Sequence, residues 1–206
     1  DLRTLWVANN AENTTKGSLT PVDPKTGKPG KPIPVDDPYN VYFSPDGKSA
    51  IIVAEALKRL DFRDPVTMKL QYTLAGINHA DFSIDGKFAI FTCEFAGTVA
   101  KVDLVNRKVL GYTQVIQPGR PIKIVKGPDG LDQEICTTWK GMPQDIRASP
   151  DGKLFYIADM MADGVHVIEL ESFRQTGFIA TGVGAHGLYP SRDGRSLYVA
   201  NRGGNQ

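Results

Sequence analysis

Polar and ionisable side chains recur at similar distances before four short Asp-Gly motifs in this chain. They stand four to seven positions ahead of the Asp of each motif, and they are Asn40, His79, Asp81, Asp145, Arg147 and His186. Two of the three histidines of the chain belong to this set. Imidazole and carboxylate groups can bind a small polar ligand, and together they also suit Zn, Fe, Cu or Ni. Such chemistry requires a fold that brings these distant positions to one place.

Three interpretations of this set stay open from the sequence. The first is a ligand site formed by all six side chains at the mouth of a central channel. The second is a metal site with His79, Asp145 and His186 as the candidate ligands. The third is structural, because polar groups at the inner edge of a strand must find hydrogen-bond partners in channel water or in the neighbouring sheet.

The elements that position these residues follow from an internal repeat, which is the first feature to establish in any sequence. Ser-x-Asp-Gly followed by a base occurs at 44–48, 83–87, 149–153 and 191–195. Each copy predicts a tight turn between two strands, because Gly accepts positive φ and Asp bonds its own backbone. A second signature, an acid followed five residues later by a base, begins at Asp23, Asp64, Asp103 and Glu169. An acid and a base placed in this way across a hairpin can pair, and an exposed pair contributes about 0–1 kcal/mol.

The two signatures together predict four short antiparallel strands in about 40 residues, which is the size of one β-propeller blade. The predicted fold is therefore all-β, a β-propeller of four-stranded antiparallel blades. Because propellers usually have about 4–8 blades, we expect a fragment of a larger ring of about seven blades, with a small ring closed by its own ends as the alternative. The predicted blades of this single partial propeller are 1–36 (partial), 38–75, 78–116, 143–181 and 185–206 (partial), with an insertion at 117–142.

Composition limits the partners that we expect. The chain has 24 Lys and Arg against 23 Asp and Glu, and its net charge of +1 gives no indication of nucleic-acid binding. We expect no membrane span, because no apolar run is long enough to cross a bilayer. No signal peptide stands at the start of the sequence, although a leader removed in the mature protein would fit the strand-like beginning. No cofactor is predicted, and Cys-x-x-Cys-His, the attachment motif of c-type haem, is absent from the sequence.

The two cysteines and the insertion carry further expectations. Cys93 and Cys136 permit one disulfide, which would join the insertion to the blade at 78–116, and a buried inert thiol at Cys93 is the alternative. A loop as long as the insertion is commonly functional, so we expect it to bind a partner or to act as a lid. His166 is predicted to face solvent or a neighbouring blade. Polar residues that end the second strands are predicted to bind adjoining loops; they are Asn9, Glu55, Glu94, Asp159 and Asn201.

Three segments together resemble one known family. Ser-Pro-Asp-Gly-Lys at 149–153, Leu-Tyr-Val-Ala-Asn at 197–201 and the Val-Asp pair with its Thr-Gly-Lys turn at 22–28 resemble the YVTN (YncE-like) β-propeller repeat family. The resemblance implies a secreted, periplasmic or surface protein of bacteria or archaea, and thus an extracytoplasmic location. Its more distant relatives include the haem d1 propeller of nitrite reductases and the heavy chain of methylamine dehydrogenase.

The function expected from this reasoning is binding rather than catalysis. We expect a non-enzymatic, extracytoplasmic propeller that binds a protein partner or a small polar ligand, at the channel mouth or at the insertion. One alternative is a metal-dependent hydrolase, lactonase or lyase of the propeller kind. Another is a propeller that binds a haem d1-type cofactor.

Overall fold

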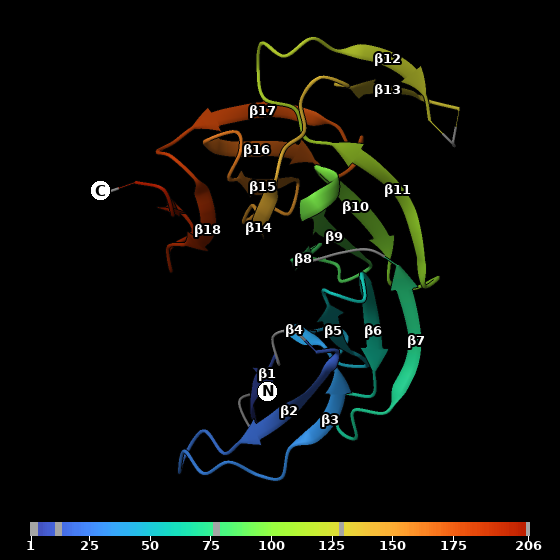
Figure 1. Ribbon diagram of the computed structural model, residues 1–206, viewed down its shortest axis with the longest axis vertical. Helices are drawn as coiled ribbons and strands as arrows, with labels where there is room; N and C mark the ends of the chain where they lie inside the picture. Colours follow the sequence, from blue (N-terminus) through green and yellow to red (C-terminus); the bar gives the residue numbers. More distant parts are fainter. Residues whose placement is uncertain (1–3, 11–13, 76–78, 128–129, 205–206) are drawn as a thin grey trace. The chain divides into compact units, whose positions relative to one another are not determined.

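The computed structural model describes residues 4–10, 14–75, 79–127 and 130–204. The chain consists of two compact units, residues 1–78 and 79–206, and both are built from antiparallel sheets of short strands (Figure 1). Within the described residues, the one helical segment is a 3₁₀ turn, Glu94–Ala96. No described helix has the length and apolar character needed to cross a bilayer. The predicted all-β propeller fold of four-stranded antiparallel blades is confirmed.

The first unit contains a three-stranded sheet and a four-stranded sheet. The three-stranded sheet has the order β1 (Leu5–Asn9), β2 (Lys16–Val22), β3 (Ile33–Asp36). The four-stranded sheet runs β4 (Pro38–Phe43), β5 (Ala50–Ala54), β6 (Arg59–Arg63), β7 (Leu70–Ala75). Every residue of β5 is buried, as its unbroken apolar sequence predicts for a strand covered on both faces. The two sheets share one apolar core, formed by Leu19, Val35, Ala50, Ile52 and Met68.

The second unit contains two four-stranded sheets and two hairpins. The first sheet has the order β8 (Ala80–Phe82), β9 (Phe88–Cys93), β10 (Thr98–Asp103), β11 (Lys108–Gln114). The second runs β14 (Pro143–Ala148), β15 (Leu154–Asp159), β16 (Gly164–Glu169), β17 (Gln175–Ala180). A last hairpin pairs β18 (Ala185–Pro190) with β19 (Leu197–Asn201). The two sheets pack through one apolar core, whose members are Ile90, Val99, Val115, Ile146, Phe155, Ile157 and Ile168.

The insertion folds into a hairpin of its own, where the sequence predicted a loop. Its strands are β12 (Lys123–Lys126) and β13 (Asp132–Ile135), and Figure 1 shows the hairpin beyond β17 and the end of β11. Its sequence signal is the run Gly-Pro-Asp-Gly at 127–130, which is typical of turns. The hairpin therefore adds a short sheet over the outer strands of the second unit.

The Asp-Gly turns have the predicted geometry. The hydroxyl of Ser149 donates to Asp151 Oδ1 over 2.6 Å, and the amide of Lys153 donates to the same oxygen over 3.1 Å. Gly152 has φ of 69°, in the left-handed region that favours glycine. The Ser149 hydroxyl and the Lys153 amide, which bond the charged carboxylate, lower the pKa of Asp151. The same serine-to-aspartate bond, 2.6 or 2.7 Å long, joins Ser44 to Asp46, Ser83 to Asp85 and Ser191 to Asp193.

The second turn signature works differently from the expectation. Asp64 accepts hydrogen bonds from the amides of Val66 and Thr67, at 3.0 and 2.7 Å, and from the Thr67 hydroxyl. Across the described chain, no ion pair joins Asp64 to Lys69 within 4.0 Å. Asp64 therefore stabilises the turn by binding its backbone rather than by pairing with Lys69 across the hairpin.

Asp159 organises the end of β15. Its buried carboxylate accepts hydrogen bonds from the amides of Met142, Met161 and Ala162, at 3.0, 2.8 and 3.0 Å. Its second oxygen lies 3.2 Å from Nε2 of His166 on β16. His166 is fully buried, so the solvent-facing alternative of the prediction is wrong. Because Met142 ends the insertion, this one carboxylate holds the insertion and the β15–β16 turn to the same strand, as the prediction that this residue binds an adjoining loop requires.

Removing the Asp159 carboxylate should destabilise the protein strongly. In Asp159→Ala, three backbone amides and a buried imidazole lose their acceptor, and we expect a loss of about 3–5 kcal/mol in the free energy of unfolding. Asp151→Ala is the matched control, because its carboxylate lies in an exposed turn, and it should cost much less. Urea unfolding followed by circular dichroism measures both; equal losses would contradict this role of Asp159.

Candidate functional site

Five of the six predicted site residues lie in the second unit, and four of them carry the argument for a cluster. His79 precedes β8, Asp145 and Arg147 lie on β14, and His186 lies on β18; all four are half-buried. Burial lowers the pKa of His79, and the positive charges of His186 and Arg147 act in the same direction. The negative charges of Asp145 and Glu94 oppose this shift. These groups therefore lie close enough to act on one imidazole, and we call His79, Glu94, Asp145, Arg147 and His186 the hub cluster.

Two predicted site residues bind backbone amides of the neighbouring sheet. Asp81 Oδ2 accepts from the amide of Ala148 on β14 over 2.7 Å, and Asp145 Oδ2 accepts from the amide of Leu188 on β18 over 3.0 Å. When the blades are aligned on their Asp-Gly turns, each of these Asp residues lies one repeat position before the residue whose amide it binds. Each Asp thus joins the first strand of its own blade to the first strand of the next. These contacts support the structural interpretation for both carboxylates.

The remaining contacts of Asp145 leave it poorly placed to hold a metal. Its Oδ1 accepts from the amide of Ile146 over 2.9 Å and from the guanidinium of Arg147 over 2.6 Å. Both carboxylate oxygens are thus already bonded. Among the residues that the structure describes, no group of three or more His, Cys, Asp or Glu side chains is arranged to hold a metal ion. The arrangement gives no support to a metal held by His79, Asp145 and His186.

Asn40 lies in the other unit, on β4, where it is paired with Val53 of β5. It is half-buried, and its side chain comes from the first strand of its blade, as the repeat predicts.

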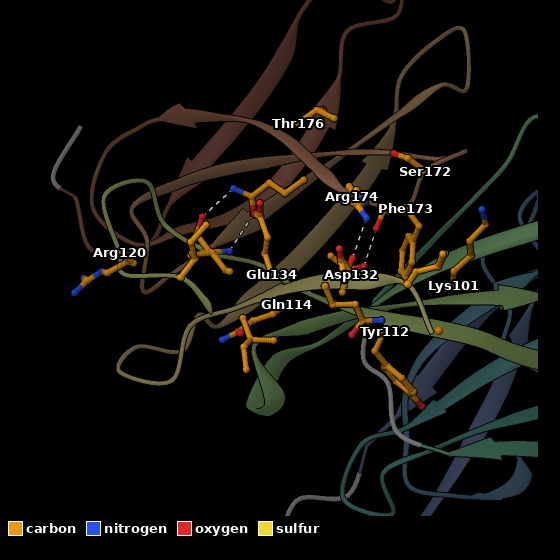
Figure 2. Close-up of a pocket in the computed structure, with 18 of the residues that line it drawn as sticks. Lys101, Tyr112, Gln114, Arg120, Asp132, Glu134, Ser172, Phe173, Arg174 and Thr176 are labelled. Carbon is orange, nitrogen blue, oxygen red and sulfur yellow. Dashed lines mark hydrogen bonds between the residues drawn. The ribbon is translucent and has the colours of Figure 1, made fainter. Parts of the chain in front are cut away.

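A cavity of about 710 Å³ lies in the second unit among β11, β13 and β17 (Figure 2). Apolar side chains from all three regions line it, including Leu110, Tyr112, Ile122, Leu131, Ile135 and Phe173. The charged residues of its lining have both signs, and they are Lys101, Arg120, Asp132, Glu134, Glu171 and Arg174. The volume is in the range of sites for small ligands, about 300–1,000 Å³. The length of the insertion predicts a functional loop, but the cavity depends on how the hairpin folds back, which the sequence does not show.

The insertion is attached at both of its ends. The side-chain amide of Gln114 donates to the carbonyl of Cys136 over 3.0 Å, and its oxygen accepts from the Cys136 amide over 2.8 Å. Gln117 donates to the carbonyl of Ala162 over 3.1 Å, and Lys140 donates to the carbonyl of Phe95 over 2.6 Å. These bonds fix the hairpin as the outer wall of the cavity.

The predicted disulfide between Cys93 and Cys136 is not formed, since both cysteines are buried and in the thiol form. Cys93 ends β9, where burial raises the pKa of its thiol to about 11. Cys136 follows β13, and its sulfur lies 3.5 Å from the hydroxyl of Thr138. That hydroxyl is the main cause that lowers the pKa of Cys136. The carboxamide of Gln114, rather than a disulfide, connects Cys136 to the neighbouring blade.

Comparison with known proteins supports the fold. No protein-family model matches the chain, and no curated protein matches it, so the resemblance to the YVTN family stays a prediction. Among solved structures, a protein from Lactobacillus plantarum matches with a TM-score of 0.75 at 15% identity, over 98% of this chain and 62% of that one.

Two further structures are candidate 6-phosphogluconolactonases. The one from Bacteroides fragilis has a TM-score of 0.67 at 19% identity, over 97% of this chain and 61% of its own. The one from Bacteroides uniformis has a TM-score of 0.66 at 20% identity, over 98% and 62%. The chain thus spans about three fifths of the length of each of these three proteins. At this level of identity the likeness shows the fold alone.

The hub cluster predicts the titration of His79. By NMR, the pKa of the His79 imidazole should lie below its ordinary value of about 6.5. Glu94→Gln should lower the pKa of His79 further, because it removes a negative charge that favours the imidazolium. Arg147→Gln should raise it, because it removes a repelling positive charge. Shifts of the same sign in the two variants would contradict this arrangement.

The cysteines predict a difference in reactivity. Thiolate is the reactive form, so at neutral pH iodoacetamide should alkylate Cys136 faster than Cys93, whose pKa is raised. Peptide mapping by mass spectrometry measures both rates in the folded chain. Cys93→Ser should leave the rate at Cys136 unchanged, whereas faster modification of Cys93 than of Cys136 would contradict the assigned environments.

Proposed function

We propose that this chain is part of a β-propeller that binds a small polar ligand, rich in hydroxyl groups, at the hub cluster. The observation that supports this most directly is that the first strands of three blades contribute half-buried ionisable groups, among which Arg147 donates to Asp145 over 2.6 Å. Arg147 and the two imidazoles offer hydrogen-bond donors, whereas Glu94 offers an acceptor. A hydroxylated ligand needs both kinds of partner at once, which an anion or a cation does not.

The position of the cluster also supports a binding role. His79, Arg147 and His186 are half-buried, so each keeps a part of its surface open to solvent. In contrast, Asp159 and His166, the other His–Asp pair of this unit, are fully buried and unable to meet a ligand directly. The first strands therefore carry polar side chains that a ligand can reach from solvent, as a ligand site requires.

Lactone hydrolysis is the second candidate function. It is favoured by the two structural neighbours that are candidate 6-phosphogluconolactonases. A sugar lactone and its acid are both rich in hydroxyl groups, so the same cluster suits either role. Binding is the primary proposal because it needs no catalytic group beyond those described, and an extracytoplasmic location remains part of it as implied by the resemblance to the YVTN family.

Thermal-shift and calorimetric titrations with gluconate and with neutral hexoses test the proposal. We expect saturable binding that weakens about tenfold or more in His79→Ala and in Arg147→Gln, since a lost hydrogen bond leaves a polar partner unsatisfied. Arg192→Gln is the matched control, because it removes a cation from an exposed turn outside the cluster, and it should bind like the unaltered chain. Binding that survives both cluster variants would contradict the site.

Hydrolysis of δ-gluconolactone separates the two candidate functions. For a binding protein, the rate with the chain present should equal the spontaneous rate measured in the same buffer. Catalysed hydrolysis that His79→Ala abolishes would replace the binding proposal by the lactonase one. Catalysis that is unaffected by His79→Ala would place the activity elsewhere in the chain.

A further inference from the structure

One wall of the cavity among β11, β13 and β17 lacks a side chain. Gly111 of β11 is paired with Lys101 of β10, so the two residues lie side by side and their side-chain positions face the same way. Both belong to the lining of the cavity. A Cβ added at Gly111 would meet no atom within 4 Å. The glycine thus leaves empty space beside the side chain of Lys101.

The turn between β16 and β17 forms the wall next to this space. Thr113 lies on the same face of β11 as Gly111, and its hydroxyl donates to the carbonyl of Phe173 over 2.7 Å. The Nζ atom of Lys101 lies 5.9 Å from the centre of the Phe173 ring. Figure 2 shows Lys101, Phe173 and Arg174 at one end of the cavity. An aromatic ring and two cations therefore border the space over the glycine.

Backbone carbonyls, rather than carboxylates, hold these two cations. The ammonium of Lys101 donates to the carbonyl of Leu170 over 2.6 Å. Through Nη2, the guanidinium of Arg174 donates to the carbonyl of Asp132 over 2.9 Å. Neither cation makes an ion pair with a described residue, and Nε and Nη1 of Arg174 make no hydrogen bond within the described chain. Both cations are thus fixed in place without being neutralised.

The acids of the lining do not balance its cations. Asp132 pairs over 2.6 Å with Lys126, which is not part of the lining. Among the described residues, the lining groups that make no ion pair are the acids Glu134 and Glu171 and the cations Lys101, Arg120 and Arg174. The cavity therefore keeps an excess of positive charge. A ligand with one negative charge neutralises this excess, whereas a doubly charged anion exceeds it.

We propose that this cavity binds a small monocarboxylate that carries an aromatic or branched apolar body. Its carboxylate pairs with Arg174, in the bidentate geometry that arginine favours, and Lys101 adds a second positive charge. Its apolar body occupies the space over Gly111 and contacts the ring of Phe173. The cavity volume of about 710 Å³ suits such a ligand, since sites for small ligands measure about 300–1,000 Å³.

Isothermal titration calorimetry of the full chain with phenylacetate tests the proposal. We expect saturable binding. Phenylacetamide has nearly the same shape without the charge, and acetate has the charge without the ring. Each should bind about tenfold more weakly or worse, because one lacks the charged hydrogen bonds and the other lacks the buried apolar surface. Benzylamine, which replaces the anion by a cation, should not bind.

Variants of the lining test the place of binding. Arg174→Gln removes the charge but keeps an amide that can donate to Asp132, and it should weaken phenylacetate binding about tenfold or more. Lys108→Gln is the matched control, because Lys108 is the cation at the equivalent turn of the preceding blade and lies outside the lining. Gly111→Leu fills the empty space, so it should abolish binding while the thermal unfolding curve stays that of the unaltered chain.

The titration of Lys101 gives a second measurement. Burial lowers the pKa of the Lys101 ammonium, and the charge of Glu171 opposes this shift. Since a bound carboxylate favours the charged amine, phenylacetate should raise the pKa of Lys101 in NMR titrations, and phenylacetamide should not. His79→Ala should leave these results unchanged, and Gly111→Leu should leave gluconate binding unchanged. The cavity and the hub cluster are thus tested separately.

The outcomes that would overturn the proposal are distinct. Equal affinities for phenylacetate and phenylacetamide would exclude recognition of the carboxylate. Unchanged binding in Gly111→Leu, or equal binding in Arg174→Gln and Lys108→Gln, would place the ligand outside this part of the cavity. Tighter binding of benzylamine than of phenylacetate would assign recognition to the acids of the lining. Failure of phenylacetate to bind the unaltered chain would exclude this class of ligand.

Discussion

The structure depends on side chains that satisfy backbone groups which short strands leave unpaired. Every turn between strands, and every junction between blades, presents amides that no ladder bonds, and a buried unpaired amide costs about 1–3 kcal/mol. Carboxylates supply the missing acceptors throughout this chain. Asp37 accepts from Ala56 and Leu57 in the first unit, and Asp163 accepts from Gly184 in the second. A propeller of short strands thus needs acidic residues at places where their charge suggests function.

Glutamine performs the same role where both a donor and an acceptor are needed. Gln175 on β17 accepts from the amide of Ile116 and donates to its carbonyl. Gln114 makes the same two hydrogen bonds with the backbone of Cys136. These two carboxamides substitute for peptide groups at the places where β11 and the insertion meet their neighbours.

The sequence predicts the fold better than the site, and the reason is physical. The Asp-Gly turns were predictable because Ser149, Asp151 and Gly152 interact with one another, so a local motif contains all the partners. The partners of Asp81 and Asp145 lie 67 and 43 positions away in the chain, on the next blade. A repeat predicts that residues at equivalent positions of each blade point in equivalent directions. It does not predict which atom of the next blade each side chain binds. The insertion was beyond prediction for a related reason, because no repeat fixes the path of 117–142.

The hub cluster illustrates how structural and available groups can be separated. Asp145 bonds a backbone amide on each of two strands as well as Arg147, so its position is fixed by the fold whether or not a ligand binds. Arg147 is in turn fixed by Asp145 and by the carbonyl of Ile146, while its side chain remains 29% exposed. A cation that is fixed in position and yet open to solvent is preorganised, since a ligand need not bear the entropy of ordering it. The carboxylate that serves the fold therefore also prepares the residue beside it for binding.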